Sequence, residues 1–178
     1  MLTVLVLYDA QGPHIEQLAA TIRQGADQVP GVESALRPIS DARQADLLNA
    51  DALVLGSPNW SGVTGQMKLW LDEQGDLWED GRLRDRVGAA FTTGRGRHSG
   101  LEITLWQLLH WMLACGLVVV GLPWSQRMRQ SGSYYGATAT GEVTEDDLIQ
   151  ARDLGQRVAQ VAGRLTQPEV RRPPASGI

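Results

Sequence analysis

Residues 3–21, TVLVLYDAQGPHIEQLAAT, contain the pattern that decides the fold. Residues 4–7 form an unbroken aliphatic run, which is typical of a strand buried on both faces of a parallel sheet. From Ile15 onward, apolar residues return at helical spacing, so one stripe of a helix is expected to pack back on that sheet. A Gly-Pro turn separates the two patterns. The stretch therefore predicts a strand, a tight turn and a helix in immediate succession.

The turn at residues 9–13, the first loop, is a candidate binding site. It follows the carboxyl end of a predicted strand, where ligands bind in open α/β sheets. Its backbone N–H groups and the start of the helix can face an anion such as a phosphate. The alternative interpretation is an ordinary connection, with His14 merely exposed near the start of the helix.

The rest of the chain repeats this alternation. We expect further strands over residues 32–39, 52–56, 87–93 and 116–122, and further helices over residues 42–48, 65–74, 102–115 and from 144 onward. The second strand is expected at an edge because its apolar residues alternate only loosely. Residues 75–83 and 131–140 have the composition of loops. Together these elements predict an α/β fold, a flavodoxin-like three-layer sandwich whose five-stranded parallel sheet has the order 2-1-3-4-5, with helices on both faces.

Two helices carry additional signals. The helix predicted over residues 102–115 is apolar almost all round, so we expect it to be buried or to face another subunit, with Trp106 in that core or interface. Cys115 at its end is expected to be a buried thiol. Thr144 with Asp147 three residues later predicts the capped start of the last helix.

Composition bounds the class of protein. The length of 178 residues and a hydrophobic content of 43% suit one domain, which we assign to residues 1–166, while residues 167–178 are proline-rich and expected to be a flexible tail. The net charge of −4 with scattered Lys and Arg argues against nucleic-acid binding. No apolar run approaches the roughly 18 residues of a membrane span, and no basic leader is visible, so we expect a cytoplasmic protein. The three histidines lack metal-ligand spacing, and no metal is assigned.

Three loops are expected to meet at one edge of the sheet: the first loop, a second loop (residues 57–62) and a third loop (residues 94–100). Gly62, Gly94, Gly96 and Gly100 allow the backbone of the later two loops to approach a ligand closely. One loop for a phosphate and two loops beside a flat ring suit a phosphorylated tricyclic ligand. FMN has that shape.

Four segments carry a resemblance to a known family. They are VLVLYDAQGPHIEQLA (residues 4–19), GSPNWSGVTGQMKLWLDEQGDLW (56–78), FTTGRGRHSGLE (91–102) and YGATATGE with EDDLIQARDLGQRVA (135–159). In order and spacing they resemble the tryptophan-repressor-binding-protein (WrbA) family of flavodoxin-like NAD(P)H:quinone oxidoreductases, over about residues 2–165. The resemblance implies FMN as cofactor, NAD(P)H as co-substrate, two-electron reduction of a quinone, and a homodimer or homotetramer with active sites near subunit contacts.

The resemblance also implies site residues. The phosphate loop corresponds to Ala10, Gln11, Gly12, Pro13, His14 and Ile15. The loop beside the flavin ring corresponds to Pro58, Asn59, Trp60, Ser61 and Gly62. The loop along the pyrimidine side corresponds to Thr92, Thr93, Gly94, Arg95, Gly96, Arg97 and His98. Trp78 matches a tryptophan near the quinone site, and no catalytic residue is assigned beyond the flavin.

The chain departs from the family at several of these positions. The family's phosphate-binding serine is Ala10, its loop aromatic is Gly12, and its loop glycine is Pro13, which has no N–H to donate. Two histidines before the fifth strand are replaced by Ala114 and Cys115, and the second loop is about one residue shorter. Losing a hydroxyl and an amide donor to a charged phosphate costs roughly 1.5–3 kcal/mol each, so we expect weakened FMN binding.

Two further features have two interpretations each. Trp60 suits stacking on a flavin ring, although a tryptophan at the end of a strand also often caps a core. Arg95, Arg97 and His98 form a basic cluster that suits the negative charge on reduced flavin or a phosphate of the nicotinamide cofactor. The alternative is that these charges are simply solvated.

The leading hypothesis is therefore an FMN-dependent NAD(P)H:quinone oxidoreductase. A second hypothesis is a flavodoxin-like electron carrier, which the small, dispersed negative charge disfavours because such carriers dock through strongly acidic faces. A third is an interaction protein that keeps the fold but has weak or lost FMN binding, which Ala10 and Pro13 favour.

Overall fold

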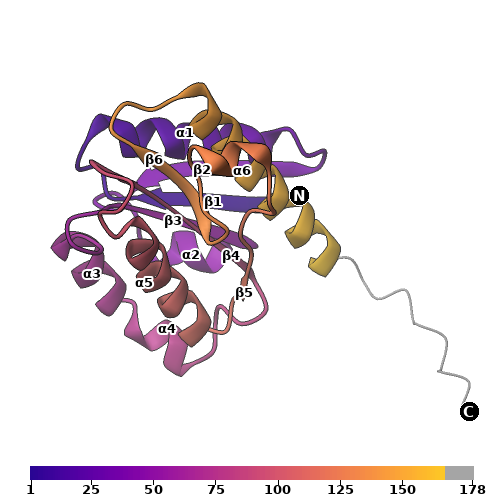
Figure 1. Cartoon of the computed structure of the whole chain (residues 1–178). Coiled ribbons are helices and arrows are strands. Elements are labelled where there is room, and N and C mark those ends of the chain that lie inside the picture. Colours follow the sequence, from indigo (N-terminus) through magenta and orange to yellow (C-terminus); the bar gives the residue numbers. More distant parts are fainter. Residues whose placement is uncertain (167–178) are drawn as a thin grey trace, which may run out of the picture.

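Strand β1 (Leu2–Tyr8) lies inside a parallel sheet, between β2 (Val32–Pro38) and β3 (Ala52–Pro58). The computed structural model describes residues 1–166 (Figure 1). Residues 4–8 of β1 are buried, since helices cover both faces of the sheet, and the predicted doubly covered strand is confirmed. The tail predicted for residues 167–178 lies outside the described residues.

The sheet continues through β4 (Val87–Gly94), β5 (Val118–Val119) and β6 (Gly136–Thr140). The order β2-β1-β3-β4-β5 confirms the predicted parallel arrangement, with β2 at an edge. Both short strands pair with β4, β5 beside its beginning and β6 beside its end. The last position in the sheet is therefore shared by two strands.

Two predictions at this edge are wrong in detail. The strand expected over residues 116–122 pairs only at β5, because the chain leaves the sheet after Val120, whose N–H still donates to Gly88 O (2.8 Å). It then forms the short 3₁₀ helix η1 (Gln126–Arg129) before it returns as β6. Residues 131–140, expected to be a loop, therefore end in a strand. Small and β-branched residues alternate along β6 and fit beside β4.

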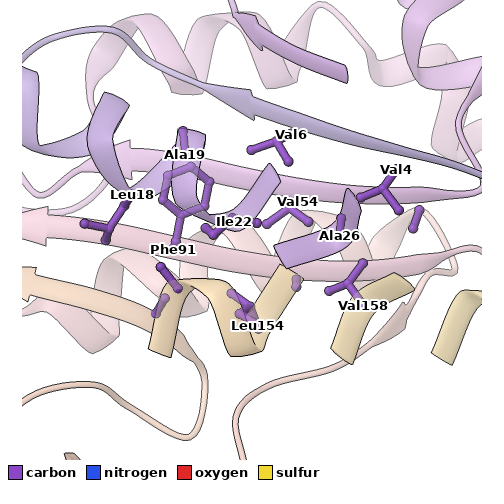
Figure 2. Close-up of a cluster of buried hydrophobic side chains, with 14 of the residues drawn as sticks. Val4, Val6, Leu18, Ala19, Ile22, Ala26, Val54, Phe91, Leu154 and Val158 are labelled. Carbon is purple, nitrogen blue, oxygen red and sulfur yellow. The ribbon is translucent and has the colours of Figure 1, made fainter. Parts of the chain in front are cut away.

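Helices cover both faces of the sheet and complete the three layers (Figure 1). One face packs against α1 (Pro13–Asp27) and α6 (Glu145–Thr166). The other packs against α2 (Gln44–Asn49), α3 (Gly65–Asp72), α4 (Gly75–Glu79) and α5 (Leu101–Ala114). Figure 2 shows the core on the first face, where Phe91 of β4 lies among side chains of α1 and α6 such as Ile22 and Leu154.

The structure corrects one expectation about the second face and shows which side of α5 is buried. Residues 75–83 are not all loop, because fully buried Leu77 anchors the helix α4 in the core. Helix α5 is buried on its inner side only, so the other alternative, contact with another subunit, stays a prediction for its outer side. Leu105 and Leu108 are fully buried, whereas Ile103 and Trp106 on the outer side are 62% and 48% exposed in the single chain.

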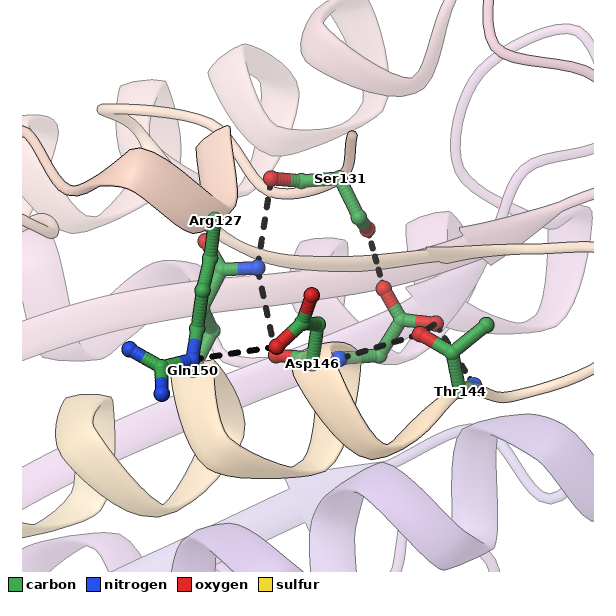
Figure 3. A network of polar contacts seen from close by, with 6 residues as sticks. Arg127, Ser131, Thr144, Asp146 and Gln150 are labelled. Atoms are coloured by element: carbon green, nitrogen blue, oxygen red, sulfur yellow. Dashed lines mark hydrogen bonds and ion pairs between the residues drawn. The ribbon is translucent and has the colours of Figure 1, made fainter. Parts of the chain in front are cut away.

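Polar contacts fix the start of α6, and Figure 3 shows them. Thr144 N–H and Oγ1–H both donate to Asp147 Oδ2 (2.8 Å each), and Asp147 N–H donates back to Thr144 Oγ1, which confirms the predicted capping pair. Ser131 Oγ also donates to Asp147, which ties the segment before β6 to this helix. Gln150 Nε2 donates to Ser131 O (3.2 Å).

Cys115 is buried after α5, as predicted, and burial raises the pKa of its thiol to about 11.

Within residues 1–166, no helix has the length and apolar character needed to cross a bilayer.

Candidate functional site

The carboxyl ends of the strands are joined by a closed set of hydrogen bonds, which we call the loop ring. Its four links connect the first loop to the start of α3, the second loop to the third loop, β4 to the turn after β6, and that turn back to α1. Each link joins residues at least 40 positions apart in the sequence. The structure therefore brings the predicted loops together at one edge.

The first link centres on Asp9, whose side chain is buried. Its carboxylate accepts hydrogen bonds from Thr64 Oγ1 and from Gln11 Nε2, the latter at 2.8 Å. Thr64 is the N-cap of α3, because its Oγ1 also accepts from Met67 N (3.1 Å). One carboxylate thus holds both the first loop and the start of the next helix.

The second link centres on Asn59. Its Nδ2 donates to Ser99 O (2.8 Å) and to Ser99 Oγ (3.2 Å), and its Oδ1 accepts from Gly62 N (3.1 Å) and Thr104 Oγ1 (3.0 Å). All the hydrogen-bonding capacity of this side chain is used to shape the second loop and to fix it against the third loop. Asn59 is therefore a positioning residue of the loop ring.

Two links close the ring at the turn after β6. Gly141 N–H donates to Gly94 O (2.9 Å), and His14 Nδ1 lies 2.6 Å from Gly141 O. Because a carbonyl only accepts, the imidazole proton of this hydrogen bond lies on Nδ1. His14 thus has a structural contact that the sequence did not indicate.

The first loop presents backbone rather than side-chain donors. Helix α1 begins at Pro13 after Gly12, and no side chain caps it. The first N–H groups of a helix have no partner within the helix, so these donors face outward. A Cβ at Gly12 would have no heavy atom within 4 Å, which shows open space beside this N-terminus.

The second loop holds Trp60 away from the core. Trp60 N–H donates to Gly62 O (2.9 Å), and the turn places Ser61 and Gly62 at positive φ. The Trp60 side chain is 62% exposed. The interpretation of Trp60 as a core cap is therefore wrong, and its ring face is free for contact with a ligand.

The third loop carries exposed charges. Arg95, Arg97 and His98 are exposed, and Arg97 Nη2 contacts the neutral Gln130 Oε1 (3.4 Å). Within residues 1–166 none of the three has a carboxylate partner. The positive charges of Arg95 and Arg97 are therefore not paired with a carboxylate at this edge of the sheet.

Several predicted site residues do not offer their side chains at this edge. Ile15 and Pro58 are buried, and the Thr92 hydroxyl donates to Ser57 O (2.7 Å) inside the sheet. Trp78 lies on α4, after α3 has carried the chain away from the loop ring by about 12 Å. In the single chain the Trp78 side chain is 49% exposed.

Sequence reasoning missed the roles of Asp9, Thr64 and Gln66. Gln66 Oε1 accepts from Gln11 Nε2 (3.0 Å), so it supports the first loop beside Asp9. Only Thr64 had a local signal, a threonine directly before a helical pattern. The other two act through contacts across 55 residues, which no local pattern indicates.

One tyrosine beside the site has a perturbed pKa. The pKa of Tyr8, at the end of β1, is raised mainly by burial and further by the carboxylate of Glu16 in the first turn of α1. The Tyr8 hydroxyl therefore stays protonated near neutral pH. It brings no negative charge to the first loop.

The residues of the three loops fit FMN, but they offer few groups that bind its phosphate. The uncapped start of α1 and the open space at Gly12 suit a phosphate, and Trp60 offers a flat apolar face. Residues 10–13 contain neither a hydroxyl nor a cation, and the Asp9 carboxylate lies next to them. The arrangement suits a flavin whose ring contributes more to binding than its phosphate does.

Comparison of the sequence with known proteins identifies the family of this chain. The family model of NADPH-dependent FMN reductases matches residues 30–127. The NAD(P)H dehydrogenase (quinone) of Archaeoglobus fulgidus is 44% identical over 135 residues, which cover 75% of this chain and 71% of that protein. The chain belongs to the WrbA-type, flavodoxin-like NAD(P)H dehydrogenase (quinone) family.

Other members of this WrbA-type family are longer. The NAD(P)H dehydrogenase (quinone) of Azorhizobium caulinodans is 35% identical over 199 residues, covering 93% of this chain and 99% of that relative. Because the alignment is longer than this chain, the relative contains insertions that this chain lacks. The structure of a WrbA-like protein from Agrobacterium tumefaciens superposes with a TM-score of 0.75 at 26% identity, covering 92% of this chain and 99% of that one. A flavodoxin from the domain Archaea, 18% identical with a TM-score of 0.71, supports the fold alone.

Proposed function

We propose that this protein is an FMN-dependent NAD(P)H:quinone oxidoreductase. The observation that carries the proposal is the loop ring, which fixes three candidate flavin-binding loops at the edge where α/β proteins bind ligands. Membership in the NAD(P)H dehydrogenase (quinone) family supports the activity.

Each loop has a distinct role in this proposal. The backbone N–H groups at the start of α1 would hold the phosphate, Trp60 would contact the flavin ring, and the backbone of Gly94 and Gly96 would offer it hydrogen bonds. Arg95 is exposed on the same third loop, and its positive charge would stabilise the negative charge that develops on the flavin on reduction.

FMN held at the loop ring would supply the redox chemistry, which is hydride acceptance from NAD(P)H and two-electron reduction of a quinone. With one proton from solvent, NAD(P)H and quinone become NAD(P)⁺ and hydroquinone. The chain itself orients the reactants and provides charge, so no acid–base pair is required.

The visible spectrum of the purified protein tests the cofactor. We expect a yellow protein, or a colourless one that takes up added FMN with quenching of the flavin fluorescence. A protein that remains colourless and takes up no FMN contradicts the proposal and favours the interaction-protein hypothesis. Stopped-flow mixing with NAD(P)H tests the activity, because fast bleaching of the flavin supports a reductase and very slow bleaching supports the electron carrier.

We also propose a cytoplasmic homodimer or homotetramer. Trp78 lies on α4, and α3 stands between it and the loop ring in the chain, so we propose that a neighbouring copy supplies Trp78 to the quinone site. The exposed apolar side of α5 offers a surface for such a copy. The net charge of −4 supports the absence of a nucleic-acid partner. Light scattering of the eluted protein measures the number of subunits.

A further inference from the structure

A cavity of about 470 Å³ lies beside the loop ring, between the third loop and the segment before β6. Arg97, His98 and the first turn of α5 line one side, while Ser133 and Thr138 line the other. We call it the third-loop cavity. Its volume lies within the roughly 300–1,000 Å³ of small-molecule sites.

We infer that the third-loop cavity binds the diphosphate and adenosine half of NADH. The inference rests on the proposed function, since it concerns the hydride donor of that same site. The third loop forms a wall of this cavity and is also fixed to the second loop by the hydrogen bond from Asn59 to Ser99. A dinucleotide with its nicotinamide at the loop ring reaches this cavity across the third loop.

The charges of the lining residues distinguish the third-loop cavity from a neighbouring cavity as a site for a diphosphate. A second cavity, of about 370 Å³, borders the first loop and is lined by the carboxylates of Asp9 and Glu73, with no Lys, Arg or His among its lining residues. The third-loop cavity instead has Arg97 and His98 in its lining, beside one carboxylate, Glu102. Of the two cavities, only the third-loop cavity offers a cation to a diphosphate, which carries two negative charges, whereas the other presents two carboxylates that repel it.

The structure also orients the cation. Arg97 Nη2 lies 3.4 Å from Gln130 Oε1, so the guanidinium reaches from the third loop toward the segment before β6. Gln130 is neutral and leaves the charge of Arg97 available. The N-terminus of α5, with Gly100 as N-cap and no side-chain cap, opens on the same cavity and adds backbone donors.

One carboxylate in the cavity points to the form of the dinucleotide. Glu102 Oε1 accepts a hydrogen bond from Ser133 Oγ (2.7 Å), whose oxygen in turn accepts from Tyr135 N (3.2 Å). Ser133 is buried, so the carboxylate is held in place. A fixed carboxylate accepts hydrogen bonds from ribose hydroxyls and repels a 2′-phosphate. The cavity therefore favours NADH over NADPH.

Binding of ADP tests the site without catalysis, because ADP contains the diphosphate and adenosine but no nicotinamide. By calorimetry, Arg97→Gln is expected to weaken ADP binding about tenfold, and Arg97→Lys to restore part of the loss. Arg129→Gln on η1, a surface arginine outside the cavity, is the matched control and leaves binding unchanged. Equal ADP affinity of wild type and Arg97→Gln overturns the inference.

Kinetics with two hydride donors separate this inference from the proposed function. Arg97→Gln is expected to raise KM for NADH about tenfold relative to KM for 1-benzyl-1,4-dihydronicotinamide, which has no phosphate and therefore reports any effect of the substitution on the flavin site itself. Glu102→Gln is expected to raise kcat/KM for NADPH relative to NADH. If both donors reduce the flavin and neither variant changes these ratios, the cavity assignment is wrong while the reductase stands. If neither donor reduces the wild-type protein, the proposed function itself fails.

Discussion

At the scale of single residues, Thr64 makes two contacts that different substitutions separate. Its hydroxyl donates to buried Asp9, and its oxygen caps α3. Thr64→Ala leaves a buried carboxylate short of one donor and removes the cap, so we expect the free energy of unfolding to fall by about 2–4 kcal/mol in urea titrations. Thr64→Ser keeps both contacts and is expected to lose less than about 1 kcal/mol. Equal losses for the two variants would contradict this account.

Ala10 tests the phosphate end of the site. It is exposed in the first loop, beside the uncapped start of α1. Ala10→Ser adds a hydroxyl donor, and a hydrogen bond to a charged phosphate contributes roughly 1.5–3 kcal/mol, so FMN affinity should rise at least about tenfold in a fluorescence titration. Riboflavin, which has no phosphate, is the control and should bind unchanged. An equal gain for both flavins would show that the substitution acts on the ring site instead.

The sequence predicted which loops carry the site but not how their side chains are used. Trp60 and the glycines have local signals, a tryptophan in a loop and residues that permit positive φ, and the structure places them at the predicted edge. Asn59 and Asp9 act through partners 40 and 55 residues away. Such contacts depend on how the strands pair, which the periodicity of one segment does not reveal.

At the scale of elements, α1 and α6 cross at very short range. A Cβ at Gly155 would lie 1.9 Å from Ile22 O, and a Cβ at Gly25 would lie 2.0 Å from Arg152 O. Gly155→Ala therefore forces the two helices apart, and we expect a loss of about 2–4 kcal/mol in the free energy of unfolding. Gly163→Ala, on the same helix with nothing within 4 Å, is the control. Helix propensity predicts that this control stabilises the protein by up to about 1 kcal/mol.

The elements themselves were largely predictable because their periodicity is strong. The amphipathic stripes of α1 and α6 and the buried run of β1 are local properties. The sharing of the fifth strand position by β5 and β6 was not predictable from the sequence. The two strands are separated by residues 120–135, and they become neighbours only because both pair with β4. Similarly, α4 depends on one buried leucine rather than on helix-forming composition.

At the scale of the whole molecule, Cys115 links stability to pH. Burial raises the pKa of its thiol from 9.0 to about 11, so the folded state retains the proton that the unfolded state loses first. The contribution is complete below pH 9 and falls as pH rises toward 11, by up to about 2 kcal/mol. Urea titrations at pH 8 and pH 10.5 should show a larger loss for wild type than for Cys115→Ala. An equal loss in the two proteins would assign the pH dependence to other groups.

The outer side of α5 is the surface at which we expect a second copy of the chain to bind. Ile103, Trp106 and Leu113 on this side are 62%, 48% and 49% exposed, although Trp106 packs partly on Tyr135 with ring centroids 4.9 Å apart. A second copy that buries this surface removes apolar area from water, at about 25 cal/mol per Å². A carboxylate introduced on this surface would lose its hydration when the second copy binds. Leu113→Glu is therefore expected to convert the oligomer to a monomer, as measured by light scattering. Leu165→Glu, equally exposed on α6, is the matched control and should keep the wild-type mass.

If Trp78 serves the site of a neighbouring copy, the Leu113→Glu monomer retains FMN binding but loses quinone reduction. A monomer with full quinone reduction would exclude that role for Trp78.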